Sequence, residues 1–434
     1  MDNMKKRFEQ IVEYIKLISS ADDYIIQWYA KDSALTRFAD NMVTQNVDIF
    51  SEKVELTSYF DGKKASLETA NLDKDGLTRL VKKCELTAKN SIKDKEYMPT
   101  LAQTDQKIIN DIDPAVIDMG SRQRAKIAKY AIERSQKEDA IAAGIVQKGI
   151  NFLGIATKNG AHKFYAKTRA EYKNTIDINN HKGAAWESDF KLDRINAEAI
   201  FEEALKDARL LNQRVELEPG RYKVLIGARA ARHLFSMMSY YGLNRRAVDE
   251  GYSAFTGKIG EKIADERINI YTDPNDKKAP AAPFNYEGQP IEKRHIIKNG
   301  VLESIPCSRF WAKENDIDAW SIGNIIFAGG EKSEAKLLAS IDRGFYIKEF
   351  WYIRMVKMND LTLTGMTRNG FFYIEDGLLV SGATHFRWND SPLSMLNRIV
   401  ELGQGSGNIP EWGRAIFAPA MIVDDFYLSS KTLF

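Results

Sequence analysis

The stretch that decides the fold is residues 249–264, which read DEGYSAFTGKIGEKIA. Its three glycines, Gly251, Gly257 and Gly260, lie within ten residues and alternate with aromatic and branched apolar side chains. That mixture is typical of backbone packed closely against another part of the protein, because glycine permits tight turns and close approach. We therefore expect a packed wall here and not a loose surface loop.

A phosphate-binding loop is the first chemistry to test against this stretch. The P-loop pattern is G-x-x-x-x-G-K-[ST]. Here five residues separate Gly251 from Gly257, and Lys258 is followed by Ile259. The ring of backbone N–H groups would have the wrong size, and the hydroxyl that binds Mg²⁺ is missing. The sequence therefore excludes a P-loop.

The stretch resembles the signature of the TldD/PmbA family of peptidase-related proteins, historically called modulators of DNA gyrase. The family segment reads G-x-S-x-F-x-G-x-x-G-E and continues to D-P and then to E-G-x-P. The matching residues of this chain are Gly251, Ser253, Phe255, Gly257, Gly260 and Glu261, then Asp273-Pro274, then Glu287-Gly288-Gln289-Pro290. The likeness covers most of the C-terminal half and, more loosely, the N-terminal half.

The resemblance implies positions for a substrate groove or a subunit interface. The candidates carried over from the signature are Gly251, Ser253, Phe255, Gly257, Gly260 and Glu261, with Glu287 and Gly288 as a nearby turn. The alternative interpretation is that these residues form turns that only define the fold. No residue is assigned as catalytic, and no cofactor is expected.

The TldD branch of the family resembles a zinc peptidase, with a His-Glu-x-x-x-His motif on the helix that precedes the signature. That spacing places two ligands on one helical face beside an acidic residue. In this chain the window is residues 230–240, AARHLFSMMSY, where His233 is followed by Leu234 and no second histidine follows. The remaining histidines (His162, His181, His295 and His385) and the two cysteines (Cys84 and Cys307) make no ligand spacing either. We expect no metal site of the TldD type, and a closer likeness to the PmbA/TldE branch, which lacks the motif.

By resemblance, the leading hypothesis is a metal-free subunit that shapes a chamber for an unfolded peptide and pairs with a TldD-like, zinc-binding subunit. A second hypothesis is a homodimeric peptide-binding or scaffold protein that leaves peptides intact. A third is a divergent peptidase with an atypical metal site built from carboxylates, with Glu250, Glu261, Asp265 and Glu287 as its candidates.

Composition restricts partners and compartment. The 62 basic and 60 acidic residues nearly cancel, so no large field of one sign attracts nucleic acid, and we expect no nucleic-acid contact. No apolar run reaches the roughly 18 residues that a spanning helix needs, and no signal peptide is visible at the N-terminus. With only two cysteines, far apart, the chain is expected to be a reduced, cytoplasmic protein.

The pattern of elements predicts an α+β protein, with a mixed α/β N-terminal half and a strand-rich, mainly antiparallel C-terminal half of the TldD/PmbA type. We place the domain boundary at Pro219-Gly220, giving domains 1–218 and 219–434. Hairpin turns are expected where Asx-Gly pairs separate alternating segments: Asp61-Gly62, Asn159-Gly160, Asn299-Gly300 and Asp376-Gly377.

Apolar residues at helical spacing predict helices over residues 4–18, 197–211 and 228–240. Residues 121–146, rich in Ala, Lys, Arg and Glu, are predicted to be largely helical. Ser391-Pro392 predicts another helix start, with Leu393 to Val400 on its inner face and Gly403 at its end. Residues 403–407, GQGSG, are interpreted as a flexible connector.

Overall fold

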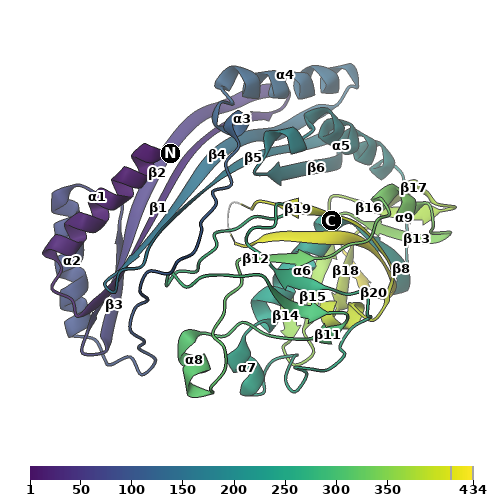
Figure 1. Ribbon diagram of the computed structural model, residues 1–434. Coiled ribbons are helices and arrows are strands. Elements are labelled where there is room, and N and C mark those ends of the chain that lie inside the picture. Colours follow the sequence, from purple (N-terminus) through teal and green to yellow (C-terminus); the bar gives the residue numbers. More distant parts are fainter. Residues whose placement is uncertain (411–412, 433–434) are drawn as a thin grey trace.

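The computed structural model describes residues 1–410 and 413–432, which build two β-sheets with their helices (Figure 1). The elements of the first part are α1 (Asp2–Ile18), β1 (Asp23–Ala39), β2 (Met42–Phe60), β3 (Lys63–Thr69), α2 (Lys74–Lys89), α3 (Pro114–Ile117), α4 (Ser121–Lys137), β4 (Ile141–Thr157), β5 (His162–Ile178), β6 (His181–Asp189), a 3₁₀ turn (Leu192–Arg194) and α5 (Ala197–Leu211).

The second part has more and shorter strands. Its elements are β7 (Arg214–Val215), β8 (Gly220–Ile226), α6 (Ala228–Gly242), α7 (Arg245–Asp249), β9 (Ile270–Thr272), β10 (Arg294–Lys298), β11 (Val301–Leu302), α8 (Arg309–Glu314), β12 (Asn324–Phe327), α9 (Glu334–Leu338), β13 (Arg343–Ile347), β14 (Phe350–Lys357), β15 (Thr362–Thr367), β16 (Phe371–Glu375), β17 (Leu378–Ala383), β18 (Phe386–Asp390), α10 (Pro392–Met395), β19 (Ile399–Asn408) and β20 (Ala415–Lys431).

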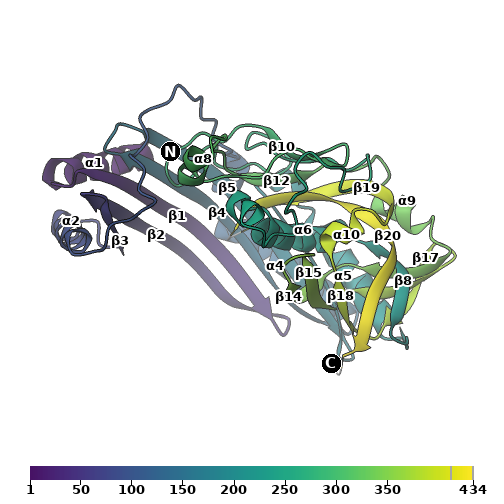
Figure 2. The ribbon, with the colours of Figure 1, turned by 90° about the horizontal axis from the view of Figure 1, so that it is seen from below.

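The first sheet is antiparallel, in the order β3-β2-β1-β4-β5-β6, and its central strands are unusually long. Alternation along β1 assigns its two faces, since successive side chains point to opposite sides. Tyr24, Ile26 and Trp28 pack beneath α1 and α2, and Phe38 packs beneath α4 and α5. Figure 1 shows α1, α2 and α4 outside the curved sheet, and Figure 2 shows the same arrangement from below.

The opposite face of this sheet meets the second part of the chain. Ile25, Ile155 and Tyr165 form an apolar cluster with Phe284, which lies on a loop between β9 and β10. Polar contacts surround the cluster: Lys167 donates to the Pro280 carbonyl. The sheet is therefore covered by helices on one side and by the C-terminal part on the other.

The second sheet is mixed but mainly antiparallel, and it is organised around β20. This strand pairs with β8, β18 and β19 in the antiparallel sense and with β12 in the parallel sense. One strand can pair with four others because it is long and its register shifts along its length. The α+β prediction, with a strand-rich and mainly antiparallel second half, is confirmed.

Helix α6 is packed against this sheet. Leu234 and Met238 are fully buried, and Phe235 packs edge-on against Phe327 of β12 with ring centroids 4.7 Å apart. The first residue of the helix follows β8 directly through Gly227, whose N–H donates to the Ile347 carbonyl of β13. Helix α6 is thus fixed by the sheet at its start and by the core along its length.

The glycine-rich signature lies between the end of α6 and the β10–β11 hairpin. Phe255 is fully buried, and a Cβ on Gly242 would lie 2.7 Å from its ring. The backbone of Ile263 and Ala264 donates to the Gly300 carbonyl in the hairpin turn. Gly251, Gly257 and Gly260 all have positive φ, so the signature is a chain of tight turns.

Most predicted elements are present, and two predicted helices run too far. Helix α5 has the predicted bounds, and the four Asx-Gly pairs are hairpin turns. The helix predicted over 121–146 ends at Lys137, because residues 141–146 pair with β1 and β5. The helix from Ser391 ends at Met395, and Ile399 begins β19.

The GQGSG segment is a strand and not a flexible connector. Gly405, Ser406 and Gly407 pair with β20 at Pro419, Ala418 and Phe417. A Cβ on Gly407 would lie 1.9 Å from the Lys278 carbonyl, so glycine is required by the close approach of another backbone. The glycines that suggested flexibility therefore serve packing.

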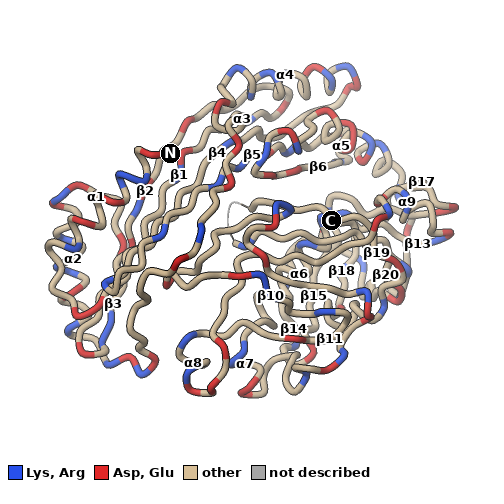
Figure 3. Tube along the Cα trace, viewed as in Figure 1, with Lys and Arg blue, Asp and Glu red and all other residues tan. Residues whose placement is uncertain are grey.

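Charged residues of both signs are interspersed over the whole trace (Figure 3). Within the described ranges no helix combines the length and the apolar character needed to cross a bilayer.

Gly300 provides a test of the contact between signature and hairpin. Its φ is +78°, and a Cβ would lie 2.3 Å from the Ala264 carbonyl, whereas Gly257 has φ +71° and open space around it. Both alanine substitutions carry the backbone strain of about 1 kcal/mol, but only Gly300→Ala adds a clash of about 1–3 kcal/mol. We expect Gly300→Ala to lower the free energy of unfolding in urea clearly more than Gly257→Ala. Equal losses of unfolding free energy in the two variants would show that the hairpin can move away from the new methyl group without loss of stability.

Candidate functional site

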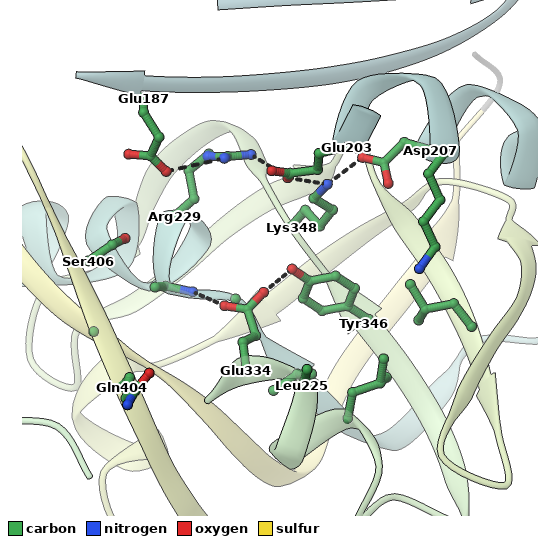
Figure 4. Close-up of a pocket in the computed structure, with 17 residues that line it drawn as sticks. Glu187, Glu203, Asp207, Leu225, Arg229, Glu334, Tyr346, Lys348, Gln404 and Ser406 are labelled. Carbon is green, nitrogen blue, oxygen red and sulfur yellow. Dashed lines mark hydrogen bonds and ion pairs between the residues drawn. The ribbon is translucent and has the colours of Figure 1, made fainter. Parts of the chain in front are cut away.

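A polar pocket lies where the two parts of the chain meet at the N-terminal end of α6 (Figure 4). It encloses about 440 Å³. Its polar lining comes from β6 and α5 on one side and from α6, α9, β13 and β19 on the other: Glu187, Glu203, Lys206, Asp207, Arg229, Glu334, Tyr346, Lys348, Gln404 and Ser406.

Two cations from the C-terminal part enter this pocket and are neutralised by three acids from the N-terminal part. Arg229 lies 3.4 Å from Glu187 and 3.3 Å from Glu203. Lys348 lies 2.5 Å from Glu203 and also pairs with Asp207. The side chains of Lys348 and Asp207 are only 6% and 5% exposed, so their ion pair is shielded from water. Glu187 and Glu203 keep 31% and 38% of their side chains exposed, and all these pairs join the two parts of the chain.

The start of α6 is capped by an acid from α9. Glu334 accepts a hydrogen bond from the Ala228 N–H at 3.2 Å and another from the Tyr346 hydroxyl. A carboxylate at this position satisfies a free N–H group and interacts favourably with the helix dipole. Burial raises the pKa of Tyr346 well above its usual value, and Glu334 adds to that shift, so the phenol is a permanent donor.

A second arginine of α6 lies one turn further on. Arg232 donates to the Ser406 hydroxyl at 2.9 Å and to the Gly407 carbonyl at 2.6 Å, which ties α6 to β19. Both Arg229 and Arg232 lie over the ring of Trp186, at 5.4 and 5.3 Å from its centroid. Burial lowers the pKa of Arg232 to about 10, and Glu187 opposes that shift.

The ionisation of Asp207 follows from its burial. Burial raises its pKa to about 6, although Lys348 works in the opposite direction. Glu203 shares the same lysine but also pairs with Arg229; burial raises its pKa, and these two cations outweigh burial, so the net shift is downward. The charge on Glu203 is therefore secure, whereas Asp207 is the group that titrates near neutral pH.

Further along α6, the outer face carries no set of metal ligands. His233 is half-buried, and its Nδ1 contacts the Phe350 carbonyl at 3.2 Å. Burial lowers its pKa. Among residues 1–410 and 413–432, no three His, Cys, Asp or Glu side chains are placed to hold a metal ion. A single, engaged imidazole on this helix does not fit the zinc site that the TldD motif would build.

At its C-terminal end α6 presents tyrosines to the solvent. Tyr240 is 73% exposed and contacts the ring of Tyr241. The adjacent Ser239 accepts a hydrogen bond from Arg414 at 3.4 Å. Tyr286 is 66% exposed, and its carbonyl accepts from Gln27 of β1, so the loop that carries this tyrosine contacts the first sheet.

The signature candidates are split between a buried and an exposed group. Ser253 and Phe255 are buried, and the Ser253 hydroxyl donates to the Gly242 carbonyl at the end of α6. Glu261 is exposed and lines a separate surface pocket with Arg221 and Asp390. Ser253 and Phe255 therefore pack against α6, whereas Glu261 lies apart from them on the surface.

Glu287 and Gly288 lie apart from the rest of the signature, at the seam between the two sheets. A Cβ on Gly288 would contact Ala161 and Ile155 of the first sheet at 3.5 Å. Glu287 lies 3.5 Å from Arg309. Burial, with the charge of Glu287 added to it, raises the pKa of Tyr59 to about 12. This turn is therefore a contact between the two parts of the chain.

The four carboxylates considered as an atypical metal site do not converge within the described part of the chain. Glu250 pairs with Arg246, Asp265 with Arg267, and Glu287 with Arg309. These three therefore have separate cationic neighbours in place of a shared centre, and Glu261 lines its own surface pocket.

Sequence reasoning missed the charged pocket at the start of α6. Its members are spread over more than two hundred positions, from Glu187 to Ser406, and each one alone resembles a solvated charge. The one local signal was Arg229 and Arg232 on the first turns of a helix, a position that ordinarily favours acids.

The raised pKa of Asp207 predicts a pH-dependent stability. The folded carboxyl keeps its proton up to about pH 6, whereas the unfolded one loses it near pH 4, so raising the pH between these values favours unfolding. We expect the free energy of unfolding of the wild type, relative to Asp207→Asn, to fall by up to about 3 kcal/mol from pH 4 to pH 6 and then to level off.

Chemical denaturation at each pH measures this difference. Asp118→Asn, which alters an exposed carboxylate after α3, serves as the control. A constant difference between wild type and Asp207→Asn across the range would contradict the assignment.

Three comparisons relate this chain to known proteins. Residues 219–430 match the family model of the PmbA/TldA metallopeptidase C-terminal domain. A protein of Archaeoglobus fulgidus described as a metalloprotease is 38% identical over 65 residues, which is 15% of this chain and 15% of that protein. That alignment thus spans a small part of the relative's length.

Solved structures share the fold over nearly the whole chain. A protein of Bacteroides thetaiotaomicron described as a modulator of DNA gyrase has a TM-score of 0.84 at 19% identity, covering 99% of both chains. One of Thermotoga maritima with the same description has a TM-score of 0.80 at 20% identity, covering 97% of this chain and 99% of that one. TldE of Thermococcus kodakarensis has a TM-score of 0.82 at 15% identity, covering 98% and 100%.

The family resemblance inferred from the signature is confirmed by these matches. The family model covers the signature and the sheet that surrounds it, and the solved structures extend the same fold through the N-terminal sheet. The C-terminal part of the chain, residues 219–430, belongs to the TldD/PmbA family by its match to that family model.

Proposed function

We propose that this chain is a PmbA/TldE-type subunit without a zinc site of its own, which holds an unfolded peptide while a TldD-like partner cleaves it. The observation that carries the proposal is on α6. This helix occupies the position of the family's zinc motif, and its one histidine, His233, is bonded to the Phe350 carbonyl. The likeness in fold to TldE of Thermococcus kodakarensis supports the same branch.

The proposed peptide surface is the C-terminal end of α6 and the seam beside it. Tyr240 and Tyr286 are both more than half exposed, and Arg414 lies between the segments that carry them. Aromatic side chains with a nearby cation can hold an extended chain of varied sequence, because they offer contact area and few specific demands. No acid or imidazole pair on α6 is available there to activate water, which fits binding without cleavage.

The seam is also held in a fixed geometry. The ion pairs of Arg229 and Lys348 join α6 and the residue after β13 to β6 and α5 on one side. On another side, the Glu287-Gly288 turn contacts the first sheet. A binding surface made from two such parts is pre-organised, which lowers the entropy lost when a flexible peptide binds.

A free sheet edge supports assembly with another chain. Strand β3 pairs only with residues 54–60 of β2, so residues 42–53 have no partner strand on their outer side within the described structure. Met42, Ile49 and Phe50 on this segment are each at least 46% exposed. Long, apolar edges of this kind are sites of strand pairing between chains.

The second candidate function, a homodimeric peptide-binding scaffold, rests on this same edge. Antiparallel pairing of β2 with its copy about Asn46 would place Val43 opposite Ile49 and Met42 opposite Phe50. In that arrangement apolar side chains face one another, which stabilises cross-strand pairs. The two candidate functions differ in what happens to the bound peptide.

Mixing experiments test the leading proposal. The chain and a TldD-like protein from the same source should form a complex by light scattering after size exclusion, and cleavage of an unfolded peptide should exceed that of either protein alone. Elemental analysis should find zinc only in the partner. No complex and no gain in cleavage would refute the proposal, whereas self-association with intact bound peptide would identify the scaffold function.

Tyr240→Ala tests the proposed peptide surface. Loss of an exposed aromatic contact should weaken binding of a fluorescent unfolded peptide to this chain by roughly five- to tenfold, about 1–1.4 kcal/mol. Ile92→Ala, at a residue 90% exposed on the connector after α2, is the control for an exposed apolar truncation and should leave binding unchanged. If Tyr252→Ala in the signature weakens binding and Tyr240→Ala does not, the surface lies on the signature instead.

A further inference from the structure

A second pocket at the junction of the two parts has a different electrostatic character. It encloses about 420 Å³ and lies between the β5–β6 hairpin, the segment after α5 and one end of the C-terminal sheet. Its lining residues are Asn180, Lys182, Leu211, Arg214, Trp351, Met366, Thr367, Arg368, Asn369, His385 and Thr432. Three of these are cations and none is an acid.

The two arginines converge on one imidazole. Burial lowers the pKa of His385 to about 4, and the charges of Arg214 and Arg368 add to the shift. Both arginines line the same pocket as the ring, although they come from segments more than 150 positions apart. His385 Nδ1 contacts the Thr367 hydroxyl at 3.3 Å, which leaves Nε2 as the ring nitrogen available to a ligand.

Arg368 is held in place without an acceptor for its N–H groups. Its guanidinium lies 4.0 Å from the centroid of the Trp351 ring, which fixes the plane of the group. Arg214 uses only Nε, which donates to the Leu211 carbonyl at 3.3 Å. Within the described ranges neither arginine has an ion pair, and both are exposed to solvent, so their remaining N–H groups are open to a ligand.

Two acids outside the lining contact residues that belong to it. Asp177 lies 3.7 Å from Lys182, at the edge of ion-pair distance. Glu349 accepts a hydrogen bond from Asn369 at 3.1 Å, and its own carbonyl accepts from the Arg368 N–H. Clustered cations without a counter-charge repel one another, and planar guanidinium edges match the oxygens of a phosphate or carboxylate.

We propose that this pocket binds the oxyanion head of a small ligand, a phosphate or a carboxylate, between Arg214 and Arg368. Lys182 adds long-range attraction at the rim, and the side chains of Asn180 and Asn369 offer further polar contacts. The volume lies within the range of small-molecule sites, so the pocket has room for more than the head group alone.

Titration calorimetry at low ionic strength tests the proposal with two kinds of probe. Inorganic pyrophosphate represents the phosphate class, and N-acetyl-alanyl-alanine represents a terminal carboxylate, with its C-terminal amide as the uncharged match. We expect saturable binding of at least one oxyanion and none of the amide. Which of the two binds more tightly identifies the source of the head group.

Variants assign the binding to the pocket. Arg368→Gln and Arg214→Gln should each weaken binding about tenfold or more, because each removes a charge-assisted contact. Arg368→Lys keeps the positive charge but loses the forked guanidinium group. Its affinity for the anion should therefore lie between that of the wild type and that of Arg368→Gln. Arg79→Gln on α2, an exposed arginine remote from this pocket, should leave binding unchanged and corrects for net charge. Circular dichroism verifies that each variant is folded.

Two outcomes would overturn the proposal. One is the absence of saturable binding for both pyrophosphate and the peptide carboxylate. The other is binding that stays the same in both Arg→Gln variants, which would place the anion elsewhere. Because Arg214 and Arg368 do not lie on α6 or at Tyr240, peptide binding and assembly with a TldD-like protein can succeed or fail independently of this result.

Discussion

The buried ion pairs of Arg229 and Lys348 are the interaction on which the arrangement of the two sheets depends. Each cation comes from the C-terminal part, and each of its acids comes from the N-terminal part. Removing one partner would leave a buried charge without compensation, which costs far more than an exposed pair contributes. The pairs therefore specify one relative placement of the sheets, while apolar contacts such as that of Phe284 supply the burial.

That placement fixes what α6 can do. Its first turn is held by Glu334 and by the ion pairs, one face of its middle is packed under the sheet, and its last turn exposes Tyr240. A helix held at three points cannot shift to bring distant ligands together. Chemistry on this helix is restricted to the side chains that the sequence places on its open face, and His233 is not free among them.

Apolar spacing and turn residues correctly predicted the elements whose ends depend on neighbouring residues. The α5 stripe and the Asx-Gly turns have the expected places because spacing and turn chemistry are properties of a few neighbouring residues. The helices predicted to continue past Lys137 and Met395 end earlier because strand pairing outweighs helix propensity. Residues 141–146, for example, pair with two neighbouring strands. The charged pocket was not predictable, since Glu187, Arg229 and Lys348 meet only after both sheets have formed.

The two pockets at the junction use cationic side chains in different ways. At the start of α6, three acids form ion pairs with two cations of the same chain, which favours a fixed structural contact. Beside His385, the arginines are positioned by Trp351 and by a carbonyl, contacts that orient a guanidinium without neutralising it. Both arginines are exposed to solvent, so a ligand can reach them. The compensation is therefore expected from outside the chain, and an oxyanion is the species whose shape and charge match both groups at once.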